Sequence, residues 1–202
     1  MLLPSPLLPD DILLRKKCKI VSLRELRTKD VQNVINQLLD YVYANSKSTK
    51  NGKKKPRVVG LSANQLGYDL NVAVVDLAIG HKDYNDIHVL VNPVITWSSK
   101  TLIEKDEGCV NLPDVRGLVK RSRRIKIEAF DRSGNKLTLD LNGWPAVLLQ
   151  HEIGHLNGKL FIDYLSNPKK AFLVKQKDFS NYKKNSKTWD KFIDVSDLVV
   201  KR

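Results

Sequence analysis

The sequence contains few cysteines and no long apolar segment. Among its 202 residues there are two cysteines, Cys18 and Cys109, which lie in very different surroundings. This argues against a disulfide framework and favours a reducing cytoplasm. The longest apolar runs, such as VAVVDLAI at 72–79, are much shorter than the roughly 20 residues of a membrane-spanning helix. We therefore expect no membrane span.

The first residues also lack the features of a targeting peptide. MLLPSPLLPDDILL at 1–14 is apolar, but three prolines and two adjacent aspartates interrupt it, and no basic segment precedes it. We expect this segment to form an extended arm rather than a signal or transit peptide.

Acidic residues are scarce relative to basic ones, 22 against 35, so the formal net charge is +13. The excess is concentrated in residues 47–57, with six basic residues and no acid, and in residues 169–191, with eight lysines and two aspartates. Such blocks are usually solvated loops or tails, but they also attract polyanions such as RNA. The interleaved aromatics and zinc-finger spacings of a base-reading module are missing.

The apolar pattern predicts an α+β fold, in which mixed or antiparallel strands surround a buried helix in the C-terminal half. The predicted elements are a helix over 26–45, strands over 71–77 and 87–96, a hairpin over 124–141, and a helix from about Pro145 to Gly158.

Glycine and proline interrupt residues 107–121, so we expect that segment to be irregular or edge-like. There is no internal repeat and no sign of a second domain. We expect one catalytic domain over 1–166, a basic C-terminal extension over 167–202 packed on it or trailing from it, and a monomer.

The segment LLQHEIGHLNG at 148–158 contains the pattern H-E-x-x-H, formed by His151, Glu152 and His155. Residues four apart lie on one face of a helix, so both imidazoles can point at one cation. The carboxylate of Glu152 flanks the same point and suits proton transfer to or from a bound water. The alternative is a buried helix without a metal. It would leave three polar groups in an apolar shell, at about 1–3 kcal/mol for each unpaired group.

Two histidines do not complete a catalytic metal site, which typically has three protein ligands. No glutamate follows His155, and residue 161 is phenylalanine where a longer H-E-x-x-H motif would place a third histidine. The third ligand therefore comes from upstream, and Cys109 in EGCVNLP is the obvious soft ligand. A small buried apolar side chain is the alternative interpretation of Cys109, and the preferred one for Cys18.

Three motifs occur in order: GLSANQ at 60–65, EGCVNLP at 107–113 and QHEIGHLNGKLFIDYL at 150–165. In sequence and spacing they closely resemble the three signature motifs of peptide deformylase, which are roughly G-x-G-x-A-A-x-Q, E-G-C-x-S and H-E-x-D-H. The resemblance extends over about residues 8–166.

The resemblance implies a deformylase fold and hydrolysis of the formyl group from N-formylmethionyl peptides, the nascent chains of translation. It implies one divalent metal held by Cys109, His151 and His155, usually Fe(II), with Zn, Ni or Co also accepted. Metal-bound hydroxide would attack the formyl carbon, and Glu152 would act as general base and then general acid.

The remaining site residues are also assigned by resemblance. The amide of Gln65 and the backbone N–H of Val110 would stabilise the oxyanion, and the region of Gly60 and Arg116 would bind the peptide backbone. For the apolar pocket that receives the methionine side chain we nominate the following residues: Val59, Trp144, Val147 and Leu148.

The sequence departs from the family pattern at four positions, which are Val58, Ser62, Asn111 and Gly154. Asn111 stays polar, so a supporting hydrogen bond is retained. Gly154 replaces the usual aspartate, which costs helix stability and removes a carboxylate that would pair with a cation, for which we nominate Arg121. None of these changes touches a metal ligand or the general base, so we expect an active enzyme.

Two rival functions remain at this point. One is a zinc peptidase that uses the same H-E-x-x-H pattern, against which the missing downstream ligand counts. The other is a basic RNA- or ribosome-associated protein with a structural metal site. The lysine-rich segments are also compatible with a deformylase held near ribosomal RNA.

Overall fold

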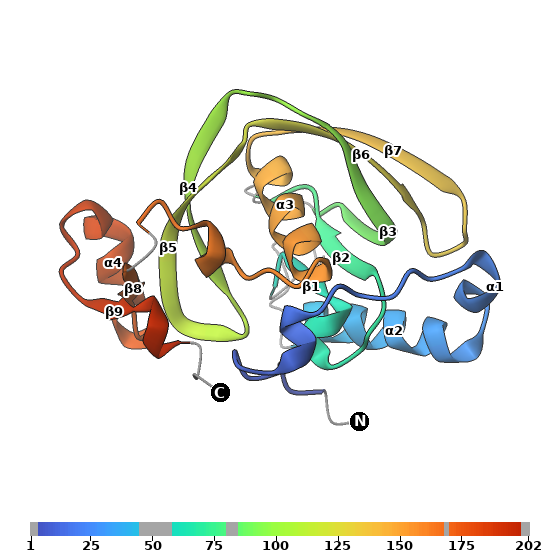
Figure 1. Ribbon diagram of the computed structural model, residues 1–202, viewed down its shortest axis with the longest axis horizontal. Coiled ribbons are helices and arrows are strands. Elements are labelled where there is room, and N and C mark those ends of the chain that lie inside the picture. Colours follow the sequence, from blue (N-terminus) through green and yellow to red (C-terminus); the bar gives the residue numbers. More distant parts are fainter. Residues whose placement is uncertain (1–3, 45–57, 80–84, 168–169, 199–202) are drawn as a thin grey trace.

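The computed structural model describes residues 4–44, 58–79, 85–167 and 170–198 (Figure 1). It contains two sheets, with strand orders β1-β2-β3-β6-β7 and β4-β5-β8-β9, and all their strand pairs are antiparallel. The helix α3 lies between them. This confirms the predicted α+β class. The lysine-rich loop predicted at 47–57 lies outside the described residues.

The first sheet consists of β1 (Gly60–Ser62), β2 (Val72–Asp76), β3 (Ile87–Ser98), β6 (Arg124–Phe130) and β7 (Lys136–Asn142). Every residue of β2 is buried, as its valine-rich sequence predicts. In the β6–β7 turn the Asp131 carboxylate accepts hydrogen bonds from the backbone N–H groups of Ser133 and Asn135, at 2.8 and 2.9 Å. The predicted strands and hairpin are confirmed, and β3 extends two residues further than predicted.

The second sheet corrects the prediction of irregular structure at 107–121. β4 (Leu102–Cys109) and β5 (Leu112–Ser122) form a long antiparallel pair, and β5 is an inner strand. Val115, Gly117, Val119 and Arg121 alternate as the buried residues of β5. A Cβ at Gly117 would overlap the side chain of Leu165. This glycine therefore permits a tertiary contact and does not mark a turn.

The N-terminal segment contains a 3-10 helix (Ile12–Arg15), the short helix α1 (Leu23–Leu26) and α2 (Lys29–Tyr43). The helix predicted over 26–45 is thus confirmed in the main, although a break at 27–28 separates α1 from α2. The Thr28 hydroxyl accepts a hydrogen bond from Val31 N at 3.4 Å and caps α2. The apolar face of α2 packs against β1 and β2.

The helix α3 (Trp144–Leu156) carries the H-E-x-x-H pattern through the centre of the molecule. Pro145 lies in its first turn, as predicted, and Gly158 has a φ of +72° just beyond its C-terminal cap. A Cβ at Gly158 would also meet the backbone of Arg15, so the N-terminal segment crosses closely over this helix end. All residues from Ala146 to Leu156 are buried except Gln150, which is half-buried.

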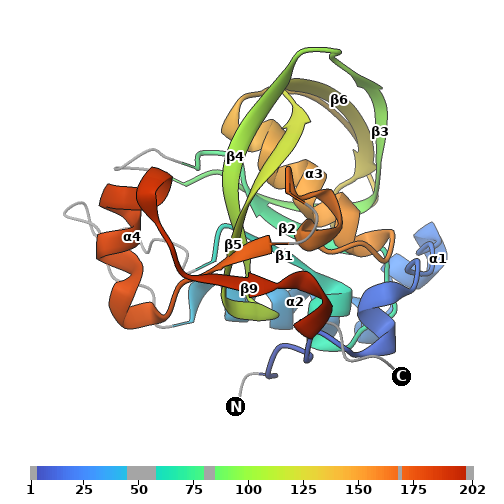
Figure 2. The same ribbon diagram turned by 60° about the vertical axis from the view of Figure 1, so that its left-hand side comes forward.

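The C-terminal extension adds two strands to the second sheet. β8 (Lys170–Leu173) pairs with β5, β9 (Phe192–Asp194) pairs with β8, and α4 (Phe179–Asn185) lies between them in sequence. In Figure 1 and in Figure 2, β4 and β5 lie between α3 and α4. The division of the chain at residue 166 stays a prediction. No helix in the described part of the chain is long and apolar enough to cross a membrane.

Candidate active site

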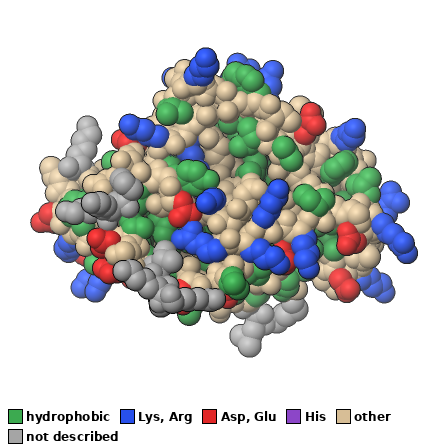
Figure 3. Space-filling model, viewed as in Figure 1, with side chains coloured by type: hydrophobic (Ala, Val, Ile, Leu, Met, Phe, Trp, Pro, Cys, Tyr) green, Lys and Arg blue, Asp and Glu red, His purple; other side chains and the backbone are tan. Residues whose placement is uncertain are grey.

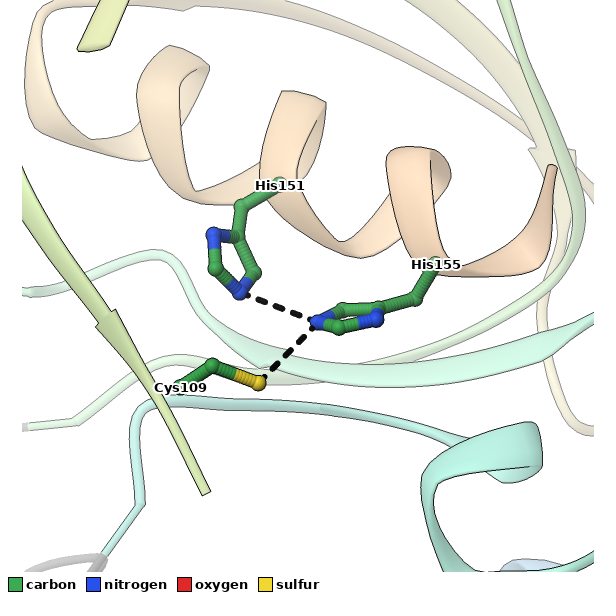
Figure 4. A group of neighbouring side chains, drawn as sticks. All are labelled: Cys109, His151 and His155. Atoms are coloured by element: carbon green, nitrogen blue, oxygen red, sulfur yellow. Dashed lines mark hydrogen bonds between the residues drawn. The ribbon is translucent and has the colours of Figure 1, made fainter. Parts of the chain in front are cut away.

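Three side chains converge beside the middle of α3 (Figure 4). His151 and His155 lie one turn apart, and their Nε2 atoms are 3.1 Å from each other. Cys109 comes from the end of β4, where the pairing with β5 shifts register, and its Sγ is 3.3 Å from His155 Nε2. One ligand atom from each residue lies within 4.8 Å of the others. The structure thus brings together all three predicted metal ligands.

This donor set fits a single divalent cation. One sulfur and two imidazole nitrogens are ligands that Zn and Fe(II) both accept, and three protein ligands leave a position for water or substrate. Burial, reinforced by the nearby His151, lowers the pKa of His155 well below its ordinary value. His155 is therefore neutral, as a metal-ligating imidazole has to be. Its Nδ1 is buried without a hydrogen-bond partner among the described residues. The polar contacts of this ring are therefore those of Nε2, with Cys109 and His151.

A buried ion pair orients His151. Its Nδ1 lies 2.8 Å from Glu107 Oε2, and Arg121 donates two hydrogen bonds of 2.8 Å to the same carboxylate. Burial raises the pKa of Glu107, but the hydrogen bonds from Arg121 and His151 outweigh it and hold the pKa at about 2. With Nδ1 fixed in this way, Nε2 of His151 faces the cluster. Burial lowers the pKa of His151, but hydrogen bonds to Cys109 and Glu107 raise it to about 10, so a cation has to displace a proton.

Glu152 is held against the first motif. The Ser62 hydroxyl donates to Glu152 Oε2 at 2.7 Å and also lies 3.1 Å from the Glu152 carbonyl oxygen. Burial raises the pKa of Glu152. Gly60 packs against the carboxylate, and an added Cβ would overlap Oε1 and would come within 2.7 Å of Leu148 Cδ1. A side chain at position 60 would collide with Glu152, so glycine at this position allows Glu152 to lie where it does.

Gln65 and Asn111 connect the first two motifs. Gln65 Nε2 donates to Cys109 Sγ at 3.2 Å and to Asn111 Oδ1 at 2.8 Å, while its Oε1 accepts from Ser62 N at 2.8 Å. Asn111 Nδ2 in turn donates to Leu7 O at 2.7 Å. The expectation that the polar residue at 111 keeps a supporting hydrogen bond is confirmed. The Gln65 amide thus contacts the ligand cluster, and its role toward an oxyanion stays a prediction.

A cavity of about 590 Å³ opens beside Cys109 and His151. Its walls include every residue nominated for substrate binding, which are Val59, Gly60, Arg116, Trp144, Val147 and Leu148, together with Gln65, Val110 and Glu152. Among these residues Arg116 is held in place by hydrogen bonds to Asp106. Its guanidinium donates to both carboxylate oxygens of Asp106, at 2.9 and 3.1 Å, and to the Asp106 carbonyl oxygen.

The structure has room for a larger side chain at position 154. An added Cβ would meet no atom closer than Lys159 O at 3.8 Å and Tyr164 Cε2 at 4.0 Å. Arg121, which we nominated as the cation that a carboxylate at position 154 would pair with, already has a carboxylate partner. Arg121 pairs with Glu107, and its guanidinium carbon lies 4.6 Å from the centre of the Tyr164 ring.

Sequence reasoning gave no role at the site to Glu107, Phe179 or Lys183, and it considered Arg121 only as the partner of a carboxylate at position 154. Glu107 and Arg121 occupy the inward-facing positions of the β4–β5 pair, a signal that was hidden once the segment was interpreted as irregular. Phe179 and Lys183 of the C-terminal extension also line the cavity, and no motif marks them in the sequence.

A sequence model of the family described as Polypeptide deformylase matches residues 7–171. The chain belongs to the polypeptide deformylase family. Members are metal-dependent hydrolases that remove the formyl group from nascent peptides, and this is the activity of the chain. The three converging ligands of Figure 4 agree with this metal dependence.

Solved deformylases share the fold. A peptide deformylase from Legionella pneumophila is 34% identical over 82% of this chain and 87% of its own, with a TM-score of 0.67. The enzyme from Thermotoga maritima is 26% identical over 83% of this chain and 100% of its own, with a TM-score of 0.69. A class I type b peptide deformylase from Acinetobacter baumannii, with Met-Ala-Ser bound, is 25% identical over 81% of this chain and 99% of its own, with a TM-score of 0.68.

Proposed function

We propose that this chain deformylates N-formylmethionyl peptides at the cavity beside α3, with Cys109, His151 and His155 holding one divalent cation. The observation that carries the proposal is the convergence of these three ligand atoms, within 4.8 Å of one another, next to the Glu152 carboxylate. A cation held there would act as a Lewis acid and would lower the pKa of a bound water toward neutrality. We propose Fe(II) as the native ion, with Zn, Ni or Co able to replace it.

Glu152 moves the proton in this proposal. Its Oε2 accepts the hydrogen bond from Ser62, which leaves Oε1 to take a proton from the attacking water and to deliver it to the leaving amine. The packing of Gly60 against this carboxylate keeps it at one position, so little reorganisation is needed when the proton moves.

Gln65 and Val110 would stabilise the oxyanion that develops on the formyl group. Gln65 already directs one N–H at Cys109 Sγ, and both residues line the cavity. The methionine side chain would enter the apolar part of the cavity, formed by Val59, Trp144, Val147 and Leu148.

The peptide backbone would bind as an added strand. Among the described strands β1 is the edge of the first sheet, so one side of it would offer main-chain hydrogen bonds beside Gly60. Arg116 would support this binding from the opposite wall, oriented by Asp106. The Met-Ala-Ser bound to the Acinetobacter baumannii deformylase is a ligand of the same kind.

The test is turnover of formyl-Met-Ala-Ser, with metal content measured after anaerobic purification. We expect Cys109→Ser to lose both metal and activity, and the matched control Cys18→Ser to keep both, because Cys18 is buried outside the cavity. Glu152→Gln should keep the metal but lose about 10²- to 10⁴-fold in kcat. Full activity after chelation, or cleavage of internal peptide bonds in place of the formyl group, would contradict the proposal.

We further propose that the protein is a cytoplasmic monomer that associates with ribosomes through its basic surface. The support is the net charge of +13 and the basic side chains spread around the face seen in Figure 3. Cosedimentation with ribosomes should weaken steeply as salt rises, and binding that is insensitive to salt would exclude this electrostatic mode.

A further inference from the structure

We propose that the C-terminal extension forms one wall of the substrate groove, and that Lys183 makes the enzyme prefer peptides with an acidic side chain shortly after the formylmethionine. The inference rests on the proposed deformylase function and adds a selectivity to it. The residues that carry it, Phe179 and Lys183 on α4, lie beyond residues 7–171, the range matched by the family.

The extension is anchored at a defined position. β8 pairs with β5 at Leu173 and Phe172, and Val174 N donates to Asp114 O at 2.8 Å. Tyr182 is fully buried, and its hydroxyl donates to Asp106 Oδ1 at 2.9 Å. Burial raises the pKa of Tyr182, so this hydroxyl stays protonated and remains a donor. The position of α4 relative to the active site is therefore fixed by backbone and side-chain bonds together.

One carboxylate, that of Asp106, connects the extension to the wall of the substrate cavity. Asp106 accepts hydrogen bonds from Tyr182 of the extension and from Arg116 of β5. The Arg116 guanidinium carbon also lies 5.4 Å from the centre of the Phe179 ring. The extension thus packs directly on the arginine that we assign to peptide binding.

The cavity continues from the metal ligands to α4. Phe179 and Lys183 line the same 590 Å³ cavity as Cys109 and Glu152. A second cavity of about 730 Å³ shares the wall at Gly108, Cys109, Arg116 and Phe179 and extends along the extension to Gln176 and Ser180. A peptide whose formyl group lies at the ligand cluster has room to run from the methionine pocket toward α4.

The unpaired charge that α4 adds to the 590 Å³ cavity is positive. Of the acidic groups that line this cavity, Asp106 is paired with Arg116, Glu107 is paired with Arg121, and Glu152 accepts a hydrogen bond from Ser62. Among the described residues Lys183 is in no ion pair, and its Nζ lies 5.3 Å from the centre of the Phe179 ring. An acidic side chain on the peptide would gain a partner here, whereas a lysine would meet a like charge.

The experiment compares C-terminally amidated peptides, so that the side chain is the only carboxylate. The probes are formyl-Met-Ala-Glu-amide, formyl-Met-Glu-Ala-amide and the same peptides with lysine in place of glutamate. For the full-length wild type we expect kcat/KM to favour glutamate over lysine by about 3- to 10-fold in at least one position, and the ratio to shrink as salt is added.

The variant Lys183→Glu should reverse this preference. Lys184→Glu is the matched control, because it makes the same change of net charge on the same helix at an exposed residue that lines neither cavity. It should keep both the preference and the activity on formyl-Met-Ala-Ser. Equal rates for glutamate and lysine peptides in the wild type, or equal effects of the two variants, would overturn the selectivity while leaving deformylation intact. If none of the formyl peptides is hydrolysed, deformylation itself fails and the selectivity fails with it.

Discussion

Replacing Gly60 by alanine tests the packing of the general base most directly. The added Cβ would overlap Glu152 Oε1 and would lie 2.7 Å from Leu148 Cδ1, a separation that real Cβ atoms do not tolerate. Leu148 is buried and Glu152 is fixed by Ser62, so neither side chain can move away freely. The carboxylate therefore has to shift relative to the ligand cluster.

The expected effects of Gly60→Ala on stability and on rate are separable. Overpacking of a filled site costs about 1–3 kcal/mol of stability. Displacing a catalytic group by about 1 Å lowers the rate about 100-fold. We therefore expect kcat/KM on formyl-Met-Ala-Ser to fall by about two orders of magnitude, and Tm to fall by several degrees.

Gly154→Ala is the matched control for this experiment. It is the same substitution near the site, but its nearest neighbours would be 3.8 and 4.0 Å away. Because Gly154 lies inside α3, alanine there should raise stability by about 1 kcal/mol and leave the rate unchanged. The reasoning is refuted if Gly60→Ala retains the wild-type rate and Tm. A lower Tm with an unchanged rate would contradict the role of Glu152, at this position, as the group that transfers the proton.

Glu107→Gln should lower metal affinity about 10- to 100-fold, measured by competition with a chelator, since His151 loses its charged partner. The pKa of Glu107 is depressed from 4.5 to about 2, so its ionised form contributes stability fully above pH 4.5, and this contribution is lost as pH falls through about 2. Denaturant unfolding of Glu107→Gln should accordingly depend less on pH over that interval. Ser62→Ala should lower kcat more than it raises KM, because it frees the Glu152 carboxylate without touching the cavity's apolar wall. Burial raises the pKa of Cys18 to about 12, so iodoacetamide at pH 8 should leave it unmodified in the folded protein, and labelling by mass spectrometry before unfolding would contradict its burial.

The chemistry of the site could be predicted from short-range patterns. The i, i+4 spacing of His151 and His155 depends only on helix geometry, and Pro145 and Gly158 mark the ends of that helix through local backbone preferences. The order of the three motifs then brought in Cys109, which the structure places 3.3 Å from His155 Nε2.

Features that depend on tertiary contacts could not be predicted in this way. We interpreted Gly117 as a break in regular structure. In the structure, glycine is needed at this position because the side chain of Leu165, 48 positions away, fills the space that a Cβ would occupy. The buried charges of Glu107 and Arg121 are favourable only as a pair, which becomes visible once the register of β4 and β5 is known. Phe179 lies in a lysine-rich segment whose composition is typical of a solvated tail, and its place at the cavity follows from the pairing of β8 with β5.

The origin of the three ligands has a consequence for the lifetime of the protein. Cys109 belongs to the sheet of β4 and β5, whereas the histidines belong to a helix that packs mainly on the other sheet. An ion held by all three therefore ties together parts that strand hydrogen bonds leave unconnected. By mass action, a free ion concentration 100 times its Kd would add about 2.7 kcal/mol to the free energy of unfolding. Depletion of that ion would then make the enzyme more susceptible to proteolysis, in addition to removing its activity.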